Sequence, residues 1–332
     1  MRDKYLAQDN RYENMTYHRS GRSGLILPEV SLGLWHNFGD TGRYENMRAI
    51  CRTAFDQGVL HFDLANNYGP ENGAAERNFG QILRDDLGIY RDELIISSKA
   101  GYHMWPGPYG DWGSKKYLIA SLDQSLKRMG LEYVDIFYHH RMDPNTPLEE
   151  TMGALSQIVK SGKALYVGLS NYDGETMKKA AKILEEERCP FVINQNCYNI
   201  FDRRIEHNGL KATAREEGKG LICFSPLAQG MLTDRYLNGI PEDSRIRTDG
   251  RFLREDVVEK RLEQIRALNE LAKERGESLS QMALKWILKD GVVTSVLVGA
   301  SKPEQLLNNL GVLKSADFTK EELDRIDEIT GN

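Results

Sequence analysis

The 332-residue chain lacks the features that mark several classes of protein. No apolar run approaches the length of about 20 residues that a helix needs to cross a bilayer. Met1 to Asn10 are polar and charged, so no signal-peptide core is present. The four cysteines are scattered and form no C-x-x-C pair, which indicates neither a zinc site nor a disulfide framework. We therefore expect a reduced, soluble, cytoplasmic protein without a bound metal.

Strong charge of one sign is also missing. The chain has 44 basic and 49 acidic residues, a net charge of −5, whereas nucleic-acid binding favours a strongly basic face. The motif G-x-G-x-x-G is absent, which disfavours an open doubly wound sheet that binds a dinucleotide. Apolar residues make up 40% of the chain, enough for a sizeable core. Because no linker, repeat or low-complexity segment interrupts it, we expect residues 1–332 to form one domain.

What the sequence does contain is a regular alternation of short apolar runs with helical patterns. Runs such as Leu94–Ile96 and Leu221–Phe224 are continuously apolar, which is typical of parallel strands covered on both faces. About eight of them predict an α/β fold, a (β/α)8 barrel. Two short segments around Ser20–Gly24 predict a β-hairpin ahead of the barrel. We expect strands at 30–35, 59–63, 94–98, 133–138, 164–169, 191–194, 220–224 and 295–298, and helices near 44–57, 75–87, 115–129, 147–160, 174–187, 205–217, 258–275, 279–289 and 303–313.

Polar side chains stand where six successive predicted strands end. In a barrel, all the carboxyl ends meet on one face, where the active site lies. Each residue alone has an ordinary explanation, since a strand-end Lys often reaches for water and Asn or Ser often begins a turn. Six in a row are much less easily explained by chance. These residues are Asp63, Lys99, His140, Ser170 with Asn171, Gln195, and Ser225, and Tyr68 lies on the loop after Asp63.

This pattern resembles the aldo-keto reductases over residues 15 to 330. Their Asp, Tyr, Lys and His tetrad corresponds to Asp63, Tyr68, Lys99 and His140. Gly-Leu-Ser-Asn, Asn-Gln and Ser-Pro-Leu follow in the family's order. The tail from Gly299 resembles the branch that contains the potassium-channel β-subunits. Within that branch, the segments 32–39, 65–70 and 104–110 resemble bacterial L-glyceraldehyde 3-phosphate reductases.

The tetrad suits carbonyl reduction, which needs a hydride for carbon and a proton for oxygen. Tyr68 is the natural acid, but a free tyrosine has a pKa of about 10. We expect the Lys99 ammonium to lower that pKa and Asp63 to hold Lys99 in place. His140 can hydrogen-bond the carbonyl oxygen or relay the proton. Adjacent strand residues point to opposite faces, which alone does not decide between His139 and His140. The register of the resembling family selects His140, and we expect His139 to support the site or the packing around it.

The resemblance implies NADPH or NADP+ as the cofactor. Ser170, Asn171 and Gln195 would hold the nicotinamide carboxamide, and Phe224 would stack on its ring. A long basic loop after the seventh strand would cover the cofactor. Ser301 would cap the following helix in a capping box. The expected cofactor residues are Gly33, Trp35, Asp63, Tyr68, Ser170, Asn171, Gln195, Phe224, Ser225, Pro226, Leu227, Gln229, Gly230, Arg235, Ser244, Arg245, Gly299, Ser301, Gln305, Asn308 and Asn309.

Aromatic residues are expected to surround the substrate. The long loop from Gly101 to Gly113 would overlie the pocket, with Trp112 at its mouth, and exclude bulky carbonyls. The resemblance adds small aldehydes as substrates, with L-glyceraldehyde 3-phosphate and methylglyoxal as candidates. A phosphorylated triose needs a cation, for which Arg141 is the candidate. The expected substrate residues are Trp35, Tyr68, Trp105, His140 and Arg141.

Two alternatives stay open. A non-catalytic, NADP(H)-binding regulatory subunit is allowed by the resemblance to channel β-subunits, although His140 favours an enzyme. A Schiff-base aldolase could use Lys99, although the ordered cofactor motifs disfavour it. The resemblance also implies a homo-oligomer, a tetramer or an octamer, with no nucleic-acid or membrane partner.

Overall fold

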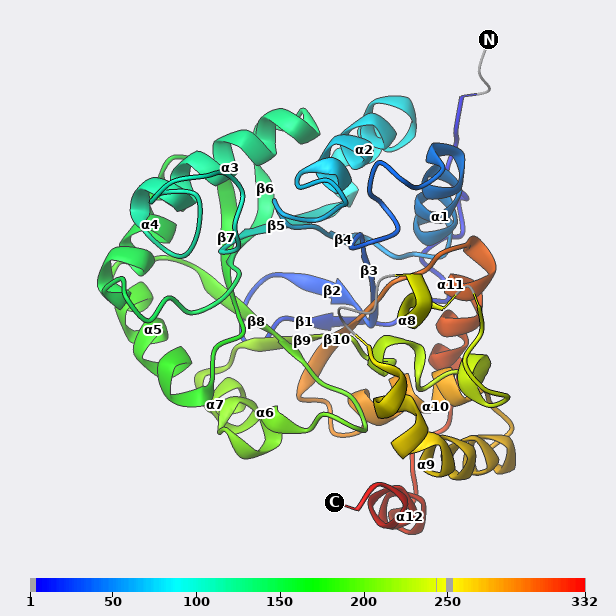
Figure 1. Cartoon of the computed structure of the whole chain (residues 1–332). Helices are drawn as coiled ribbons and strands as arrows, with labels where there is room; N and C mark the ends of the chain where they lie inside the picture. The colour runs from blue at the N-terminus through cyan, green and yellow to red at the C-terminus, as the bar shows by residue number, and fades with distance from the viewer. Residues whose placement is uncertain (1–3, 243, 249–252, 332) are drawn as a thin grey trace.

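The structure, a computed structural model, describes residues 4–242, 244–248 and 253–331. Eight parallel strands close into a barrel in the order β10-β3-β4-β5-β6-β7-β8-β9, surrounded by helices (Figure 1). The predicted (β/α)8 barrel is therefore confirmed. The strands are β3 (Val30–Gly33), β4 (His61–Asp63), β5 (Ile95–Ala100), β6 (Val134–His139), β7 (Ala164–Ser170), β8 (Phe191–Cys197), β9 (Gly220–Phe224) and β10 (Val293–Val298).

The predicted N-terminal hairpin is also present. Strands β1 (Tyr17–Arg19) and β2 (Ile26–Pro28) pair antiparallel, immediately before β3 begins. Leu25 and Leu27 pack with Ile136, Ile193 and Ile222, which come from β6, β8 and β9. The hairpin therefore covers the end of the barrel where its strands start, and leaves the opposite end to the functional loops.

The helices follow the predicted pattern with four main differences, one of which is the short, unpredicted helix α8. The predicted helix 205–217 is two helices, because Gly209 adopts a left-handed φ of 77° between them. The predicted helix 75–87 stays α-helical only to Ile82. A C-terminal helix was not predicted. The helices are α1 (Tyr44–Asp56), α2 (Ala74–Ile82), α3 (Lys115–Met129), α4 (Leu148–Lys160), α5 (Gly174–Glu186), α6 (Arg204–His207), α7 (Leu210–Glu217), α8 (Arg245–Thr248), α9 (Glu255–Glu274), α10 (Leu279–Leu288), α11 (Pro303–Leu310) and α12 (Lys320–Thr330).

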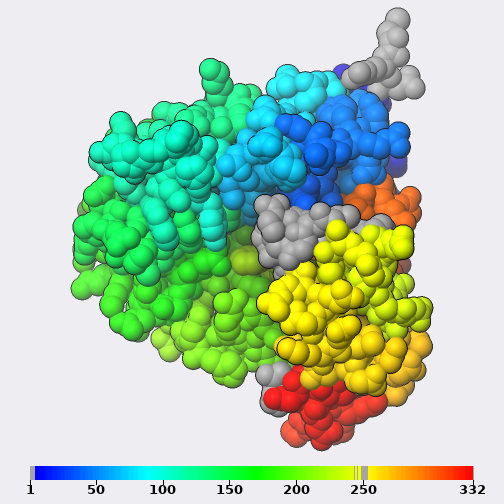
Figure 2. Space-filling view, in the orientation of Figure 1, coloured from blue at the N-terminus to red at the C-terminus, as the bar shows by residue number. Residues whose placement is uncertain are grey.

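The unpredicted helix α12 carries a clear start signal. The Thr319 side chain accepts from the Glu322 backbone N–H, and the Glu322 side chain accepts from the Thr319 backbone N–H, a capping box. The helix packs against α9 and lies at the far edge of the molecule from the N-terminal segment (Figure 2). It therefore extends the fold beyond the predicted elements, and its Asp327 accepts from Arg203, which follows β8, at 2.7 Å.

The loop after β9 is long, as predicted. It runs from 225 to 254 and contains the short helix α8 before α9 begins. That this loop covers a cofactor stays a prediction, as does the division of the chain into domains. Of the helices in the described ranges, none combines the length and apolar composition that a bilayer crossing requires.

Candidate active site

A buried ion pair lies at the carboxyl ends of β4 and β5. Lys99 Nζ donates to Asp63 Oδ2 and, at 2.7 Å, to the carbonyl oxygen of Leu64. Neither the Asp63 nor the Lys99 side chain has exposed area. Asp63 Oδ1 accepts from Ser97 Oγ at 2.7 Å and from Gln195 Nε2 at 3.1 Å. Both carboxylate oxygens therefore have donors, as a buried charge requires.

Tyr68 approaches this pair from the loop after β4. Its hydroxyl oxygen accepts a hydrogen bond from Lys99 Nζ at 3.3 Å. Burial raises the pKa of Tyr68 well above its usual value, and the charge of Asp63 adds to the rise. Burial also lowers the pKa of Lys99, against the opposing effect of Asp63. The net direction for the Tyr68 pKa is upward, because burial removes water from the phenol; the expected lowering by the Lys99 ammonium stays a prediction.

The two adjacent histidines face different environments. His140 follows β6, and its ring centroid lies 5.9 Å from that of Tyr68, with an interplanar angle of 72°. Burial, reinforced by the charge of Lys99, lowers the pKa of His140 well below its usual value, so the ring is neutral at neutral pH. His139 lies on the other side of the strand, where its Nδ1 is 2.7 Å from the Tyr172 hydroxyl.

The long loop after β5 is held by Arg141. Arg141 Nε donates to the carbonyl oxygen of Gly101 at 2.7 Å, and its Nη2 donates to Asp111 Oδ1 at 2.7 Å. The guanidinium carbon lies 4.3 Å from the ring centroid of Tyr102 and 3.6 Å from that of Trp112. Two of the three guanidinium nitrogens are thus engaged with this loop. A role for Arg141 as a phosphate ligand stays a prediction.

The same loop reaches the tetrad. The Tyr102 ring stands at 88° to the His140 ring, with centroids 4.7 Å apart. Trp105 packs on Tyr117, whose hydroxyl donates to the Tyr102 carbonyl oxygen. The loop is therefore fixed beside His140. Sequence reasoning missed Tyr102, for which no signal stood out, and Ser97, whose place two residues before Lys99 puts both on one face of β5.

The candidate cofactor residues gather at the carboxyl ends of the strands. Gln195 lies on β8 and bonds to Asp63, and Asn171 Nδ2 donates to the His140 carbonyl oxygen at 2.9 Å. Ser170 and Phe224 are the last residues of β7 and β9. Gly33 is the last residue of β3, and others follow β3, β9 and β10 in the chain, namely Trp35, the run Ser225, Pro226, Leu227, Gln229 and Gly230, and Gly299.

Backbone strain concentrates at this end of the barrel. Of seven non-glycine residues described with positive φ, six follow the carboxyl end of a barrel strand: His36, Trp112, Asn171, Ser225, Ala228 and Gln229. Left-handed conformations of non-glycine residues persist where the surroundings enforce them, often at ligand sites. This supports a binding role for the loops after β7 and β9.

The remaining candidates show one error. Ser301 does not cap α11, whose N-cap is Lys302 without a side-chain cap. Instead, the Ser301 hydroxyl donates to Gln305 Oε1 at 2.9 Å, so the predicted capping box is wrong.

The other predicted cofactor residues are placed as follows. Asn308 Nδ2 donates to Ser280 of α10 at 2.9 Å, and Asn309 is buried. Arg235 lies in a short 3-10 turn and Ser244 is buried. The side chain of Arg245 lies outside the described part of the structure.

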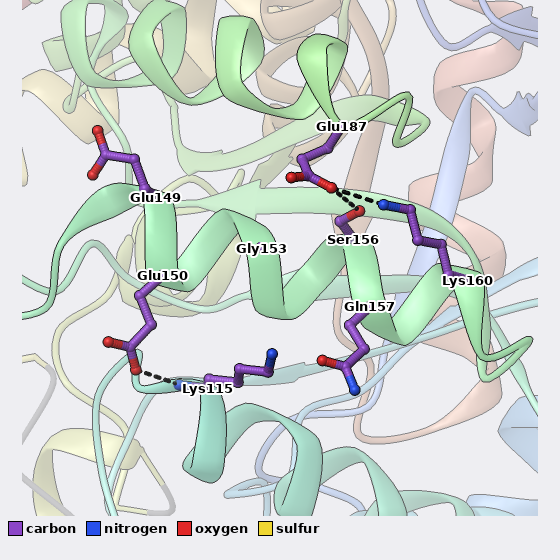
Figure 3. A pocket seen from close by; sticks show the side chains of 8 residues that line it. All are labelled: Lys115, Glu149, Glu150, Gly153, Ser156, Gln157, Lys160 and Glu187. Atoms are coloured by element: carbon purple, nitrogen blue, oxygen red, sulfur yellow. Dashed lines mark hydrogen bonds and ion pairs between the residues drawn. The ribbon is translucent and has the colours of Figure 1, made fainter.

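A groove of about 500 Å³ lies elsewhere, along α4 (Figure 3). Ser156 Oγ and Lys160 Nζ both donate to Glu187 on its wall, at 3.1 and 2.7 Å. The groove is lined by charged and polar side chains of the helical layer and includes none of the tetrad. We therefore assign no chemistry to it.

Comparison with known proteins shows the family. A profile of the aldo/keto reductase family matches residues 29–330. This chain belongs to that family. It is 57% identical, over 98% of its own length and 95% of the relative's, to the L-glyceraldehyde 3-phosphate reductase of Escherichia coli O157:H7. It is 34% identical to a probable voltage-gated potassium channel subunit beta of Oryza sativa subsp. japonica, over 95% of this chain and 96% of the relative. It is 35% identical to a putative voltage-gated potassium channel subunit beta of Schizosaccharomyces pombe, over 96% of this chain and 94% of the relative.

For a member of the aldo/keto reductase family, the site has the expected composition. The family implies a nicotinamide cofactor. Within the described ranges, no group of three or more His, Cys, Asp and Glu side chains is arranged to hold a metal ion.

Proposed function

We propose that this protein is an NADPH-dependent reductase that converts small aldehydes to alcohols, with L-glyceraldehyde 3-phosphate as its principal substrate. The similarity to an L-glyceraldehyde 3-phosphate reductase supports the substrate. The observation that carries the chemistry is the contact of the buried Asp63–Lys99 pair with the Tyr68 hydroxyl, beside His140. Methylglyoxal is a second proposed substrate, on the ground of its small size.

The four tetrad residues have distinct proposed roles. The bound cofactor supplies the hydride. Tyr68 donates the proton to the carbonyl oxygen, because burial keeps the phenol protonated at neutral pH. Lys99 then stabilises the phenolate that remains, and Asp63 holds Lys99 within reach. Neutral His140 hydrogen-bonds the carbonyl oxygen and orients it toward Tyr68.

The residues at the strand ends fit a nicotinamide cofactor. The strained loops after β7 and β9 present amide and hydroxyl groups beside the tetrad. We propose that Ser170, Asn171 and Gln195 hold the carboxamide and that Phe224 packs on the ring. The basic loop before α9 would hold the phosphates, with Arg235 and Arg245 among the proposed contacts; the other candidate cofactor residues keep the roles expected above.

A preference for NADPH is proposed to rest on Arg245. The 2′-phosphate of NADPH offers a guanidinium a bidentate partner that NADH lacks. Arg245→Ala should weaken NADPH binding several-fold and leave NADH binding nearly unchanged, as measured by fluorescence titration. Equal losses for both cofactors would assign Arg245 to the shared pyrophosphate or to the fold.

The experiment that tests the function is a substrate panel with the purified protein. We expect NADPH oxidation with L-glyceraldehyde 3-phosphate and methylglyoxal at higher kcat/KM than with steroid or long-chain carbonyls. A reverse order would refute the small-aldehyde assignment.

A second candidate is a regulatory subunit, which the 34–35% identity to the potassium-channel relatives favours. It predicts NADPH binding without turnover of any aldehyde in the panel. We further propose that the protein is cytoplasmic and that it forms a homo-oligomer. Analytical ultracentrifugation would measure the oligomeric state.

A further inference from the structure

A line of polar side chains crosses the interior of the barrel beneath the ion pair. Ser295 Oγ lies 2.7 Å from Ser31 Oγ, which lies 3.0 Å from His61 Nδ1. His61 Nε2 lies 2.9 Å from Ser97 Oγ, which donates to Asp63 Oδ1 at 2.7 Å. All five residues are completely buried. They come from the adjacent strands β10, β3, β4 and β5, so the line follows the sheet to the tetrad.

The Asp63 carboxylate at the end of this line determines the direction of every hydrogen bond in it. The Asp63 carboxylate only accepts, so the single Ser97 hydroxyl proton points to it. Ser97 Oγ must then accept from His61, which places the imidazole proton on Nε2. Burial lowers the pKa of His61 to about 4, so the ring is neutral at neutral pH and its Nδ1 is an acceptor. Ser31 therefore donates to Nδ1, and Ser295 donates to Ser31.

The other half of the barrel interior shows that polar residues are not needed merely to fill it. On β6, β8 and β9 the inward-facing residues include Ile136, Ile193 and Ile222, which form one apolar cluster. Burying a histidine and three serines is unfavourable unless each finds a partner. Here every partner lies along a single path that leads to Asp63.

We propose that His61 is a positioning residue for the reduction, and that the chain Ser295–Ser31–His61–Ser97 holds Asp63 so that Lys99 stays aligned on Tyr68. This inference rests on the proposed function. Donors that all point toward one carboxylate polarise one another and stabilise its charge in a low-dielectric interior. The chain is a fixed support, not a path for protons, because it ends at Ser295, which is buried.

The first test compares variants that remove donors with a variant that preserves one. We expect Ser97→Ala and His61→Leu to lower kcat about tenfold or more, the size of effect of losing a hydrogen bond to a buried charge. His61→Gln keeps an N–H that can reach Ser97, so it should retain most of the wild-type kcat. KM for methylglyoxal and the Kd of NADPH should change by less than about twofold in all three, because neither His61 nor Ser97 is among the proposed substrate or cofactor contacts.

Ser156→Ala is the matched control. Ser156 is also a buried serine whose hydroxyl donates to a carboxylate, that of Glu187, but on the helical layer (Figure 3). We expect wild-type kcat for this variant. If His61→Leu does not fold, Ser97→Ala and Ser31→Ala carry the test, with Ser31→Ala expected to reduce kcat less because it lies farther from Asp63. A wild-type kcat in Ser97→Ala, or an equal loss in His61→Gln and His61→Leu, would overturn the proposal.

The second test does not depend on turnover. Nitrogen-15 NMR of histidine-labelled wild-type protein, assigned with His61→Gln, should show a protonated Nε2 and an unprotonated, hydrogen-bonded Nδ1. Ser31→Ala should shift the Nδ1 signal. A proton on Nδ1 of His61 would refute the proposed hydrogen-bond directions even if the enzyme is active. If the wild type reduces no aldehyde but shows the expected tautomer, the proposed function fails and the described chain stands without its catalytic role.

Discussion

Replacing Tyr68 by phenylalanine removes one oxygen atom from the centre of the site. The ring stays, and so does the Asp63–Lys99 pair, because Lys99 keeps its bonds to Asp63 and to the carbonyl oxygen of Leu64. What is lost is a 3.3 Å hydrogen bond from Lys99 and the proton that the phenol is proposed to transfer. The variant therefore separates proton donation from the architecture around it.

The expected size of the effect follows from these contacts. Loss of a positioned general acid lowers the rate about 10²- to 10⁴-fold, equivalent to about 3–5.5 kcal/mol in the activation barrier. Loss of one long hydrogen bond should reduce the free energy of unfolding by about 1 kcal/mol or less. We therefore expect kcat to fall by at least two orders of magnitude, while the Kd of NADPH and the melting temperature change little.

The assay is steady-state NADPH oxidation, combined with cofactor titration and thermal unfolding. Tyr17→Phe is the matched control, since the Tyr17 hydroxyl donates to the Gly58 carbonyl oxygen at 2.8 Å in the N-terminal hairpin. It should keep wild-type kcat. Reduction by Tyr68→Phe at near the wild-type rate would refute the assignment of Tyr68 as the acid, and a large loss of NADPH binding would show a structural role instead.

Three further outcomes follow from the contacts. Lys99→Met should abolish most activity and reduce the free energy of unfolding by about 3–5 kcal/mol in urea denaturation, because it leaves Asp63 buried without its cation; unchanged stability would contradict this. Arg141→Met should raise KM for the phosphorylated aldehyde much more than for methylglyoxal, which carries no phosphate, whereas an equal rise for both would show that the guanidinium only holds the loop. Burial lowers the pKa of His61 and His139 to about 4, from about 6.5 in the unfolded chain. Their contribution to the free energy of unfolding, about 3 kcal/mol each, is therefore complete above pH 6.5 and is lost as the pH falls toward 4. A wild-type melting temperature that does not fall over this pH range would contradict this expectation.

Much of the fold could be predicted because buried parallel strands have a strong sequence signal. Runs such as Leu221–Phe224 are apolar throughout, and strand β9 lies where that run predicts it. The ends of helices were harder to predict, because a single glycine can end a helix. Gly209 divides α6 from α7, yet a glycine in a helical pattern is often tolerated. Helix α12 was missed although Thr319 and Glu322 form a capping box, since its apolar face is thin and only Ile326 is fully buried.

The site was predictable in part for a similar reason. Asp63, Lys99 and His140 lie at or just after the carboxyl ends of strands, and the barrel topology alone places such residues on one face. The electrostatics of Tyr68 were not predictable, because the degree of burial depends on how the loop after β5 packs. The inward-facing His61 was overlooked, since a lone histidine within a strand carries no signal until its neighbours Ser31 and Ser97 are placed across adjacent strands.

The central claim is that this protein delivers hydride from NADPH to a small aldehyde with Tyr68 as the proton donor. The most direct test is to incubate wild-type protein and Tyr68→Phe with NADPH deuterated at the reactive carbon and L-glyceraldehyde 3-phosphate, and to analyse the product by mass spectrometry. The account predicts the corresponding alcohol carrying one deuterium on the former aldehyde carbon, formed at least about 100-fold more slowly by Tyr68→Phe. Absence of deuterated alcohol with wild-type protein, or equal rates for the two proteins, would contradict it.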